Sequence, residues 1–259
     1  MNFLFKLLTI LYSLVSFFDR KVFIRDIEKD DLVLDVGSGD KPFWRADVMV
    51  DKYLEDDQQR ATGAIVYDKR KLFVEADVEN LPFKDKAFDF VFCAHLLEHV
   101  SHPDRAIKEL TRVAKCGYIE VPSAIGDIFS SFPVHLWYCD CRDNVLIFQQ
   151  KSKVLSFHQE IVKNFGSKIN RSSILNYLLV KYASYYIQVF WKKSVDYKII
   201  RVSNPYKYQY TPHDNYTKTT TENSVFNLYR IFYLVVTALY YRKKDISIDS
   251  LFKNDKERN

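Results

Sequence analysis

A short apolar run that ends in two closely spaced glycines constrains the fold of this chain more than any other feature. Residues 32–36 are almost wholly apolar, and Gly37, Ser38 and Gly39 follow at once in a chain with only 6 glycines among 259 residues. Such a run is typical of a buried strand, and the glycines allow a sharp turn and a close approach to a ligand because neither carries a Cβ. The segment predicts a strand that ends at a small-molecule site, although an ordinary loop can have the same sequence.

Four similar runs follow at intervals that suit parallel strands joined by crossovers. They cover residues 48–51, 72–74, 88–93 and 118–121. Near-continuous apolar character is typical of strands that are buried on both faces. Before the last of these runs, Pro103 is expected to begin a helix that Gly117 ends. The apolar face of this helix comprises Ala106, Ile107, Leu110, Val113 and Ala114. The pattern predicts an α/β fold around a mostly parallel sheet.

The chain after residue 123 is less regular. We expect a hairpin over residues 135–150 that turns at 142–144, a helix over 172–193, a strand over 197–202 and a polar connector over 203–224.

An acidic residue stands at the end of each of the first three expected strands. Asp35 precedes the glycines, Asp51 closes the second strand and Asp77 follows the third. A carboxylate can accept two hydrogen bonds from a ribose diol, and one beside neighbouring backbone groups can accept from an adenine amino group. Because parallel strands end at one edge of a sheet, the three acids predict a single nucleoside pocket there.

At this level of detail the sequence resembles a known family. Residues 33–39, 73–91 and 96–100 are similar to class I S-adenosylmethionine-dependent methyltransferases, in the broad group that modifies small molecules, lipids and sugars. The resemblance covers about residues 30–123. It implies a Rossmann-like, mostly parallel seven-stranded sheet with flanking helices, and S-adenosyl-L-methionine across the carboxyl edge of that sheet.

The resemblance also implies cofactor contacts, residue by residue. Asp35, Gly37, Ser38 and Gly39 would surround the methionine moiety, Asp51 would bind the ribose, Asp77 and Val78 would lie at the adenine, and Cys93, Ala94 and His95 would lie behind the sulfonium.

Two features depart from the family pattern. Lys41 replaces the usual third glycine, and so few residues separate Gly39 from Asp51 that the first crossover helix must be very short. The cofactor carboxylate would then meet a different anchor, Lys41 or Arg45.

Methyl transfer is an in-line displacement, so the protein mainly has to align the acceptor and exclude water. A base helps when the acceptor is a hydroxyl or an amine, and the candidates are His95, His99 and His135. His135 and Trp137 are candidate substrate contacts, whereas the alternatives are a structural helix start for His95 and His99 and burial in the hairpin for His135. We expect no metal, because His135, Cys139 and Cys141 lack the spacing of a zinc site and the two cysteines can pack on one strand face.

Charge is divided unevenly along the chain. Residues 1–150 carry 19 Lys and Arg against 25 Asp and Glu, and residues 151–259 carry 19 against 8. The second part is also rich in aromatic residues, so it can face nucleic acid, an anionic membrane or an anionic substrate. An AT-rich genome would produce part of the same bias.

Both ends of the chain predict amphipathic helices. Residues 1–18 are nearly all apolar except for a polar stripe of Lys6, Thr9, Ser13 and Ser16, and residues 225–241 are similar and precede three basic residues. Helices of this kind can lie on an anionic membrane surface or pack on the domain itself.

We therefore divide the chain into an amphipathic segment (1–30), a methyltransferase domain (31–203) with an acceptor-site insertion (about 124–195), and a connector with a C-terminal amphipathic helix (204–259). The leading hypothesis is a methyltransferase for a small-molecule, lipid-linked, quinone-like or glycan acceptor. The four cysteines form no disulfide framework, which favours the cytoplasm, with peripheral contact to the membrane. An RNA methyltransferase ranks lower because no RNA-binding module is recognisable, and a non-catalytic cofactor-fold binding protein is the third alternative.

Overall fold

The computed structural model describes residue 24 and residues 26–54, 65–66, 68–130, 134–153, 186–208 and 220–253. The expected N-terminal helix (1–18) lies outside these residues, as does the first part of the expected helix 172–193. The strands are β1 (Val33–Val36), β2 (Val48–Asp51), β3 (Leu72–Glu75), β4 (Phe88–Ala94), β5 (Ala114–Pro122), β6 (Trp137–Arg142), β7 (Val145–Gln150), β8 (Tyr186–Lys192) and β9 (Tyr197–Ile200). The helices are α2 (Pro103–Val113), α3 (Ala124–Ser130), α6 (Thr220–Tyr240) and α7 (Ile248–Leu251).

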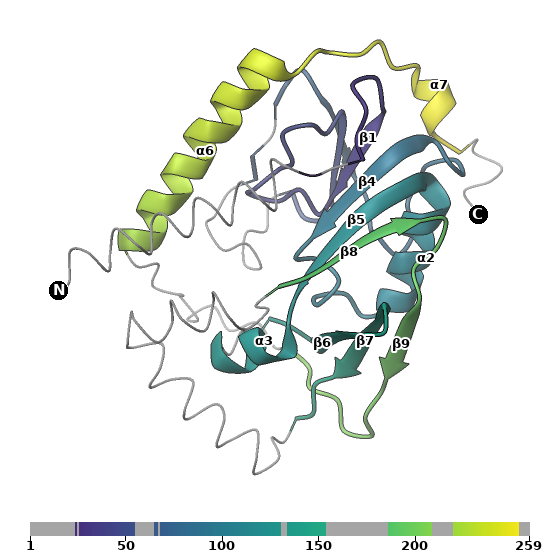
Figure 1. Cartoon of the computed structure of the whole chain (residues 1–259), viewed down its shortest axis with the longest axis vertical. Coiled ribbons are helices and arrows are strands. Elements are labelled where there is room, and N and C mark those ends of the chain that lie inside the picture. Colours follow the sequence, from purple (N-terminus) through teal and green to yellow (C-terminus); the bar gives the residue numbers. More distant parts are fainter. Residues whose placement is uncertain are drawn as a thin grey trace.

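A mostly parallel sheet forms the centre of the molecule (Figure 1). Six described strands lie in the order β3-β2-β1-β4-β5-β8, and only β8 is antiparallel to its neighbour. This confirms the α/β fold class, but the described sheet has six strands rather than the expected seven. After β5 the chain leaves this sheet and builds a second one, β6-β7-β9, before and after it contributes β8.

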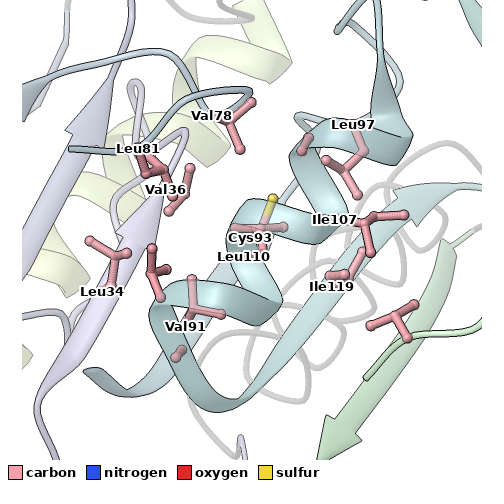
Figure 2. Close-up of a cluster of buried hydrophobic side chains, with 14 of the residues drawn as sticks. Leu34, Val36, Val78, Leu81, Val91, Cys93, Leu97, Ile107, Leu110 and Ile119 are labelled. Carbon is pink, nitrogen blue, oxygen red and sulfur yellow. The ribbon is translucent and has the colours of Figure 1, made fainter. Parts of the chain in front are cut away.

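The apolar runs of β1, β2, β4 and β5 are mostly buried because both faces of the sheet are covered, whereas β3 at the edge is partly exposed. On one face, Ile107 and Leu110 of α2 pack with Leu34, Val91 and Ile119 in the main core cluster (Figure 2). On the other face, Phe43 from the loop after β1 stacks on Phe92, with 4.5 Å between the ring centroids. Neighbouring positions of β4 thus face opposite clusters, which explains why its sequence has no polar alternation.

Gly117 lies inside β5 and does not end a helix, so the expected helix end is wrong. Helix α2 ends at Val113 and the chain enters β5 directly. A Cβ on Gly117 would lie 2.5 Å from the Val91 carbonyl oxygen and 2.8 Å from the Trp191 ring. The close approach of three strands requires a glycine at this position. The sequence prediction took this glycine for the end of a helix, whereas it meets a packing requirement within a strand.

Residues 186–192 form strand β8, where we expected the end of a helix. Their burial alternates, with Ile187 and Trp191 buried and Gln188 and Phe190 exposed, as a strand requires. The aromatic and β-branched residues of this segment suit a strand that pairs with β5. The expected hairpin is confirmed as β6 and β7, whereas the C-terminal helix begins at Thr220, inside the expected connector.

The C-terminal segment is fastened to the sheet at two places. Lys244 Nζ lies 2.8 Å from Asp47 Oδ2. Further on, the Lys84 amide donates to the Leu251 carbonyl at 2.8 Å, and Phe252 forms an antiparallel bridge with Phe83. These contacts hold the chain at Lys244, within the 241–247 linker that follows α6, and again at residues 251–253.

None of the helices in the described part of the chain combines the length and the hydropathy needed to cross a bilayer.

Candidate functional site

The strand order places the switch point of the sheet, where open α/β sheets form a ligand crevice, at the carboxyl ends of β1 and β4. β1 lies between β2 and β4, so the crossovers leave β1 in opposite directions at this point. In open α/β sheets, ligands bind at such a switch point, outside the carboxyl ends of the strands. The glycine turn follows β1 and His95 follows β4, so the structure brings these two predicted segments to the same edge.

The glycine turn adopts the backbone that its sequence predicts. Gly37 and Gly39 have φ angles of +76° and +48°, a region that L side chains rarely adopt. A Cβ on Gly37 would also lie 2.9 Å from Leu96 Cδ2, because the loop after β4 closes over the turn. At Gly39 the nearest atom would be Asp51 Oδ2 at 3.7 Å, so there the backbone conformation alone requires glycine.

Carboxylates hold this turn in place. Asp35 is 2% exposed, and its Oδ2 accepts from the Phe43 amide at 2.7 Å. Asp51 Oδ2 accepts from the Gly39 amide at 2.9 Å, and Asp51 Oδ1 accepts from the Tyr53 amide at 3.1 Å. Each carboxylate oxygen has a second lone pair, so Asp51 can bind the turn and a ribose hydroxyl together.

Two buried polar atoms in the turn suit a ligand. Ser38 and Asp40 are 3% and 8% exposed, and among the described residues Ser38 Oγ and Asp40 Oδ2 have no hydrogen-bond partner. Buried polar atoms are rarely left without partners. The amino and carboxylate groups of the methionine moiety of S-adenosylmethionine carry matching donors and acceptors, so this part of the site fits the cofactor.

Asp77 is engaged by a lysine. Lys52 Nζ lies 2.7 Å from Asp77 Oδ2, and the Glu79 amide donates to Asp77 Oδ1 at 2.9 Å. Although burial alone would raise it, these contacts lower the pKa of Asp77 below its usual value. The carboxylate is therefore ionised near neutral pH and lies near Asp51, whose carbonyl accepts from the Ala76 amide at 3.1 Å.

The remaining predicted cofactor contacts are mostly buried. Val78 and Cys93 belong to the main core cluster, and Cys93 is 0% exposed (Figure 2). Ala94 is 9% exposed at the end of β4. The Cys93 side chain faces the core, so only the backbone of this residue is placed for a ligand.

The first crossover departs further from the family pattern than its length predicts. Residues 37–47 contain no helix. The Arg45 guanidinium donates to the carbonyls of Ile27 and Glu28, at 2.8 and 2.7 Å, whereas Lys41 is exposed. Of the two expected carboxylate anchors, Lys41 is the one whose charge remains at the surface.

His95 lies between two buried carboxylates. Its Nδ1 lies 3.3 Å from Glu98 Oε1 and its Nε2 lies 3.0 Å from Glu120 Oε1. The two glutamates are 0% and 1% exposed, and the His95 backbone has a φ of +56°. Burial would lower the pKa of His95, but the contacts with Glu120 and Glu98 raise it. The two carboxylates favour the protonated ring and engage both ring nitrogens, so His95 is held in a fixed position.

His99 and His135 lie together deeper in the same region. Their ring centroids are 4.7 Å apart and nearly perpendicular. His135 Nδ1 lies 2.8 Å from Asp127 Oδ1, and Lys151 Nζ lies 2.5 Å from Asp127 Oδ2. Burial lowers the pKa of His99 to about 4, so its ring is neutral near pH 7.

Sequence reasoning missed the acids that organise these histidines. Glu98 stood out in the sequence only as part of the family motif. No sequence pattern marked Glu120 or Asp127 as site residues. Although burial would raise it, His95 and the other nearby histidines lower the pKa of Glu98 to about 2. A buried carboxylate between histidines is visible only after the segments that carry them are placed in space.

The hairpin residues have different positions from those expected of a substrate site. Trp137 is 1% exposed in the core, and its indole N–H donates to the Val100 carbonyl at 2.7 Å. The Trp137 side chain therefore packs in the core, and its contact with a substrate stays a prediction. Cys139 is buried in the same core, Cys141 packs against it, and both are free thiols, which confirms their expected packing role.

Comparisons with known proteins find similarity to methyltransferases. A family model described as a methyltransferase domain matches residues 47–119, from the start of β2 to β5. The chain is 51% identical over 45 residues to the ubiquinone/menaquinone biosynthesis C-methyltransferase UbiE of Ectopseudomonas oleovorans, covering 17% of this chain and 26% of that protein. It is 34% identical over 88 residues to an uncharacterized protein of Methanocaldococcus jannaschii, covering 34% of this chain and 38% of that protein.

A solved SAM-dependent methyltransferase from Thermotoga maritima is similar at 23% identity with a TM-score of 0.32, covering 48% of this chain and 56% of that one. The chain thus spans less than half of the length of the two sequence relatives. The matched segment includes the strand ends that carry Asp51, Asp77 and His95. Residues 47–119 are therefore similar to a methyltransferase domain.

Proposed function

We propose that the whole chain is an S-adenosylmethionine-dependent methyltransferase that binds its cofactor across the glycine turn and its acceptor beside the histidines after β4. The observation that carries the proposal is the hydrogen bond between Asp51 and the Gly39 amide, at 2.9 Å. It joins the turn after β1 to the acid after β2, which is the arrangement that a nucleoside needs at a switch point.

Each part of the turn has a role in this proposal. Asp35 fixes the loop after β1 through the Phe43 amide. Gly37 and Gly39 allow the backbone to approach the methionine moiety. Ser38 lies between the two glycines as a polar contact. Asp51 would accept from the ribose hydroxyls, Asp77 and Val78 would border the adenine, and the backbone at Cys93, Ala94 and His95 would lie behind the sulfonium.

When bound, S-adenosylmethionine supplies a methyl carbon that bonds to the acceptor atom while its bond to sulfur breaks and leaves a neutral thioether. The protein's own contribution is to align the acceptor and to exclude water. His95 is held by Glu98 and Glu120 on its two sides, so its position is fixed before any ligand enters. We assign His95 a positioning role, and we place the acceptor beside the neighbouring His99 and His135.

The test is cofactor binding by calorimetry with the wild type, Asp51→Ala and Asp140→Ala. Asp140 is an exposed carboxylate in the hairpin, paired with Arg142, and serves as the matched control. Loss of a charge-assisted pair of hydrogen bonds costs about 2 kcal/mol, which is roughly a thirtyfold rise in Kd. Equal affinity in the wild type and in Asp51→Ala would contradict the ribose assignment, and absence of binding by the wild type would favour the non-catalytic alternative.

For the acceptor, we propose a lipid-linked, quinone-like or glycan molecule at a membrane surface. The name of the similar UbiE protein is consistent with a quinone acceptor. Helix α6 supports contact with a membrane surface. The exposed side of α6 carries Ile231, Leu234, Val235 and Leu239, each at least 50% exposed. These positions repeat at intervals of three, one and four residues and so form one apolar stripe.

Basic residues border this stripe. Arg230 precedes it, and Arg242 and Lys243 follow the helix; all three are exposed. The opposite face of α6 is buried through Tyr233 and Thr237. An apolar stripe flanked by cations suits an anionic bilayer surface, where the apolar side chains enter the interface and the cations meet headgroups.

Vesicle sedimentation tests this contact with the full chain. Leu234→Asp should reduce binding to vesicles that contain anionic lipid, whereas Ile248→Asp should not. Ile248 is 61% exposed on α7, outside the stripe, and is therefore a matched control. If the wild type binds anionic and neutral vesicles equally weakly, or if both variants behave alike, the membrane contact is wrong.

A further inference from the structure

We propose that Glu98, His99 and His135 form a binding site for a divalent transition-metal cation of the Zn²⁺ class at the acceptor end of the crevice. One potential ligand atom from each residue lies within 4.8 Å of the others. The sequence led us to expect no metal, because the spacing of His and Cys residues in the chain is unsuitable. In the structure, these ligands come from two segments that meet in space: Glu98 and His99 lie in the loop after β4, and His135 lies in the segment that enters β6.

The ligand types favour zinc-like ions over Mg²⁺ or Ca²⁺. Two imidazoles and one carboxylate are a common set for catalytic zinc and for other divalent transition metals, whereas Mg²⁺ and Ca²⁺ prefer oxygen ligands. Three protein ligands also leave a coordination position open, as catalytic metal sites do.

The buried polar atoms of this cluster point to a missing ligand. Glu98 is 0% exposed, and among the described residues neither of its carboxylate oxygens makes a hydrogen bond. Its contacts with His95 and His99, at 3.3 and 3.9 Å, are ion-pair distances. His99 Nδ1 is also buried without a hydrogen-bond partner in the same set of residues. A cation bound among them would satisfy the Glu98 carboxylate and this ring nitrogen together.

A second layer of contacts orients the proposed ligands. Asp127 accepts from His135 Nδ1, and in that tautomer the lone pair of the ring is on Nε2. Metal-binding histidines typically donate their other ring N–H to a carboxylate, a carbonyl or water. Lys151 holds the second oxygen of Asp127, at 2.5 Å, so the orienting carboxylate is itself fixed.

The potential ligand atoms lie somewhat farther apart than the ligands of a bound metal ion do. With metal–ligand distances of about 2.1 Å, the ligands of a tetrahedral ion lie roughly 3.4 Å apart. Separations of up to 4.8 Å therefore have to contract by at most about 1.4 Å, which rotations of the Glu98 and His99 side chains can provide.

The use of the cation rests on the proposed function. In its open position the cation would bind an acceptor oxygen and lower the pKa of that hydroxyl, with the proton released to solvent. This favours a hydroxylated acceptor over an amine and assigns no base to the neighbouring histidines.

Calorimetry with ZnCl₂ on protein dialysed against EDTA tests the site without any cofactor present. The wild type should bind one Zn²⁺ per chain, and Co²⁺ should give the visible absorption of a site with nitrogen and oxygen ligands. Glu98→Gln and His99→Gln should weaken Zn²⁺ binding about a hundredfold, and Asp127→Asn should weaken it about 10- to 100-fold. His102→Ala is the control, because His102 is paired with Glu79 outside the cluster.

Zn²⁺ binding by the two ligand variants at wild-type affinity would mean an adventitious surface ion only and would overturn the site. Absence of Co²⁺ absorption in the wild type would also overturn it, and this readout needs no variant to fold. A titration with S-adenosylmethionine separates the two proposals. If the cofactor binds and Zn²⁺ does not, the metal site is wrong and the proposed function stands, and the reverse result leaves a metal site without a methyltransferase.

Discussion

Replacement of Gly37 by alanine should destabilise the fold through two separable effects. The first is backbone strain, because φ is +76° and a non-glycine residue in the left-handed region costs about 1–2 kcal/mol. The second is a clash, because the new Cβ would lie 2.9 Å from Leu96 Cδ2 and 3.2 Å from Leu96 Cβ. Overpacking of this kind costs about 1–3 kcal/mol, so we expect a total loss of about 2–5 kcal/mol.

Gly39→Ala is the matched control for the strain. Gly39 also has a positive φ, +48°, but its Cβ would meet nothing closer than 3.7 Å. Both variants restrict the unfolded chain equally, so the difference between their unfolding free energies isolates the Leu96 clash at about 1–3 kcal/mol.

Urea unfolding of four proteins measures the clash directly: the wild type, Gly37→Ala, Leu96→Ala and the double variant. Leu96→Ala removes the Cδ atoms at 2.9 and 3.2 Å but keeps the Cβ at 3.2 Å, so the rescue should be partial. We expect a coupling energy of about 1–2 kcal/mol in the stabilising direction. If Gly37→Ala and Gly39→Ala are equally stable and the double variant is additive, the loop after β4 does not close over the glycine turn as described.

Three further changes test the packing around the sheet. Gly117→Ala should cost about 3 kcal/mol in urea unfolding, since its Cβ would lie 2.5 Å from the Val91 carbonyl oxygen, and a loss below 1 kcal/mol would contradict that strand spacing. Burial lowers the pKa of Lys71 to about 8, so between pH 8 and 10.5 the unfolded chain binds more protons and the folded state gains stability as the pH rises. Relative to Lys71→Met, the wild type should therefore gain about 2 kcal/mol between pH 7 and 9.5, and a difference that is independent of pH would refute the burial effect. Lys244→Met should cost about 1–3 kcal/mol in thermal unfolding, because it leaves the Asp47 carboxylate, 1% exposed, without its cation, and an unchanged midpoint would show that the contact is not formed.

The central sheet was largely predictable because its signals are local. Residues 48–51 form β2 with the expected bounds, and the Gly37 and Gly39 turn has the backbone that its sequence requires. A continuous apolar run predicts a buried strand, and a glycine pair predicts a turn, from the neighbouring residues alone. Strand β8 was missed because its aromatic and β-branched residues follow a segment with helical spacing, and only pairing with β5 decides its conformation.

The acceptor side of the site was less predictable because its chemistry depends on contacts between distant segments. His95 was correctly placed at the end of β4, but its pairing with Glu120 depends on the alignment of β4 and β5. The meeting of His99 and His135 likewise depends on the path from β5 to β6. The Trp137 signal was ambiguous, since a large amphipathic side chain near a site suits substrate binding as well as it suits a core.

The fastening of the C-terminal segment has a consequence for how the molecule would work on a surface. Lys244 is held by Asp47, and residues 251–253 are held beside Phe83, so the 241–247 linker has little freedom to swivel. Trp44, which follows the glycine turn in the chain, also lies edge-on to Tyr240 at the end of α6, with 6.4 Å between the ring centroids. Attachment through α6 would thus impose a single tilt on the sheet, and an acceptor carried by that surface would approach the crevice from one constant direction.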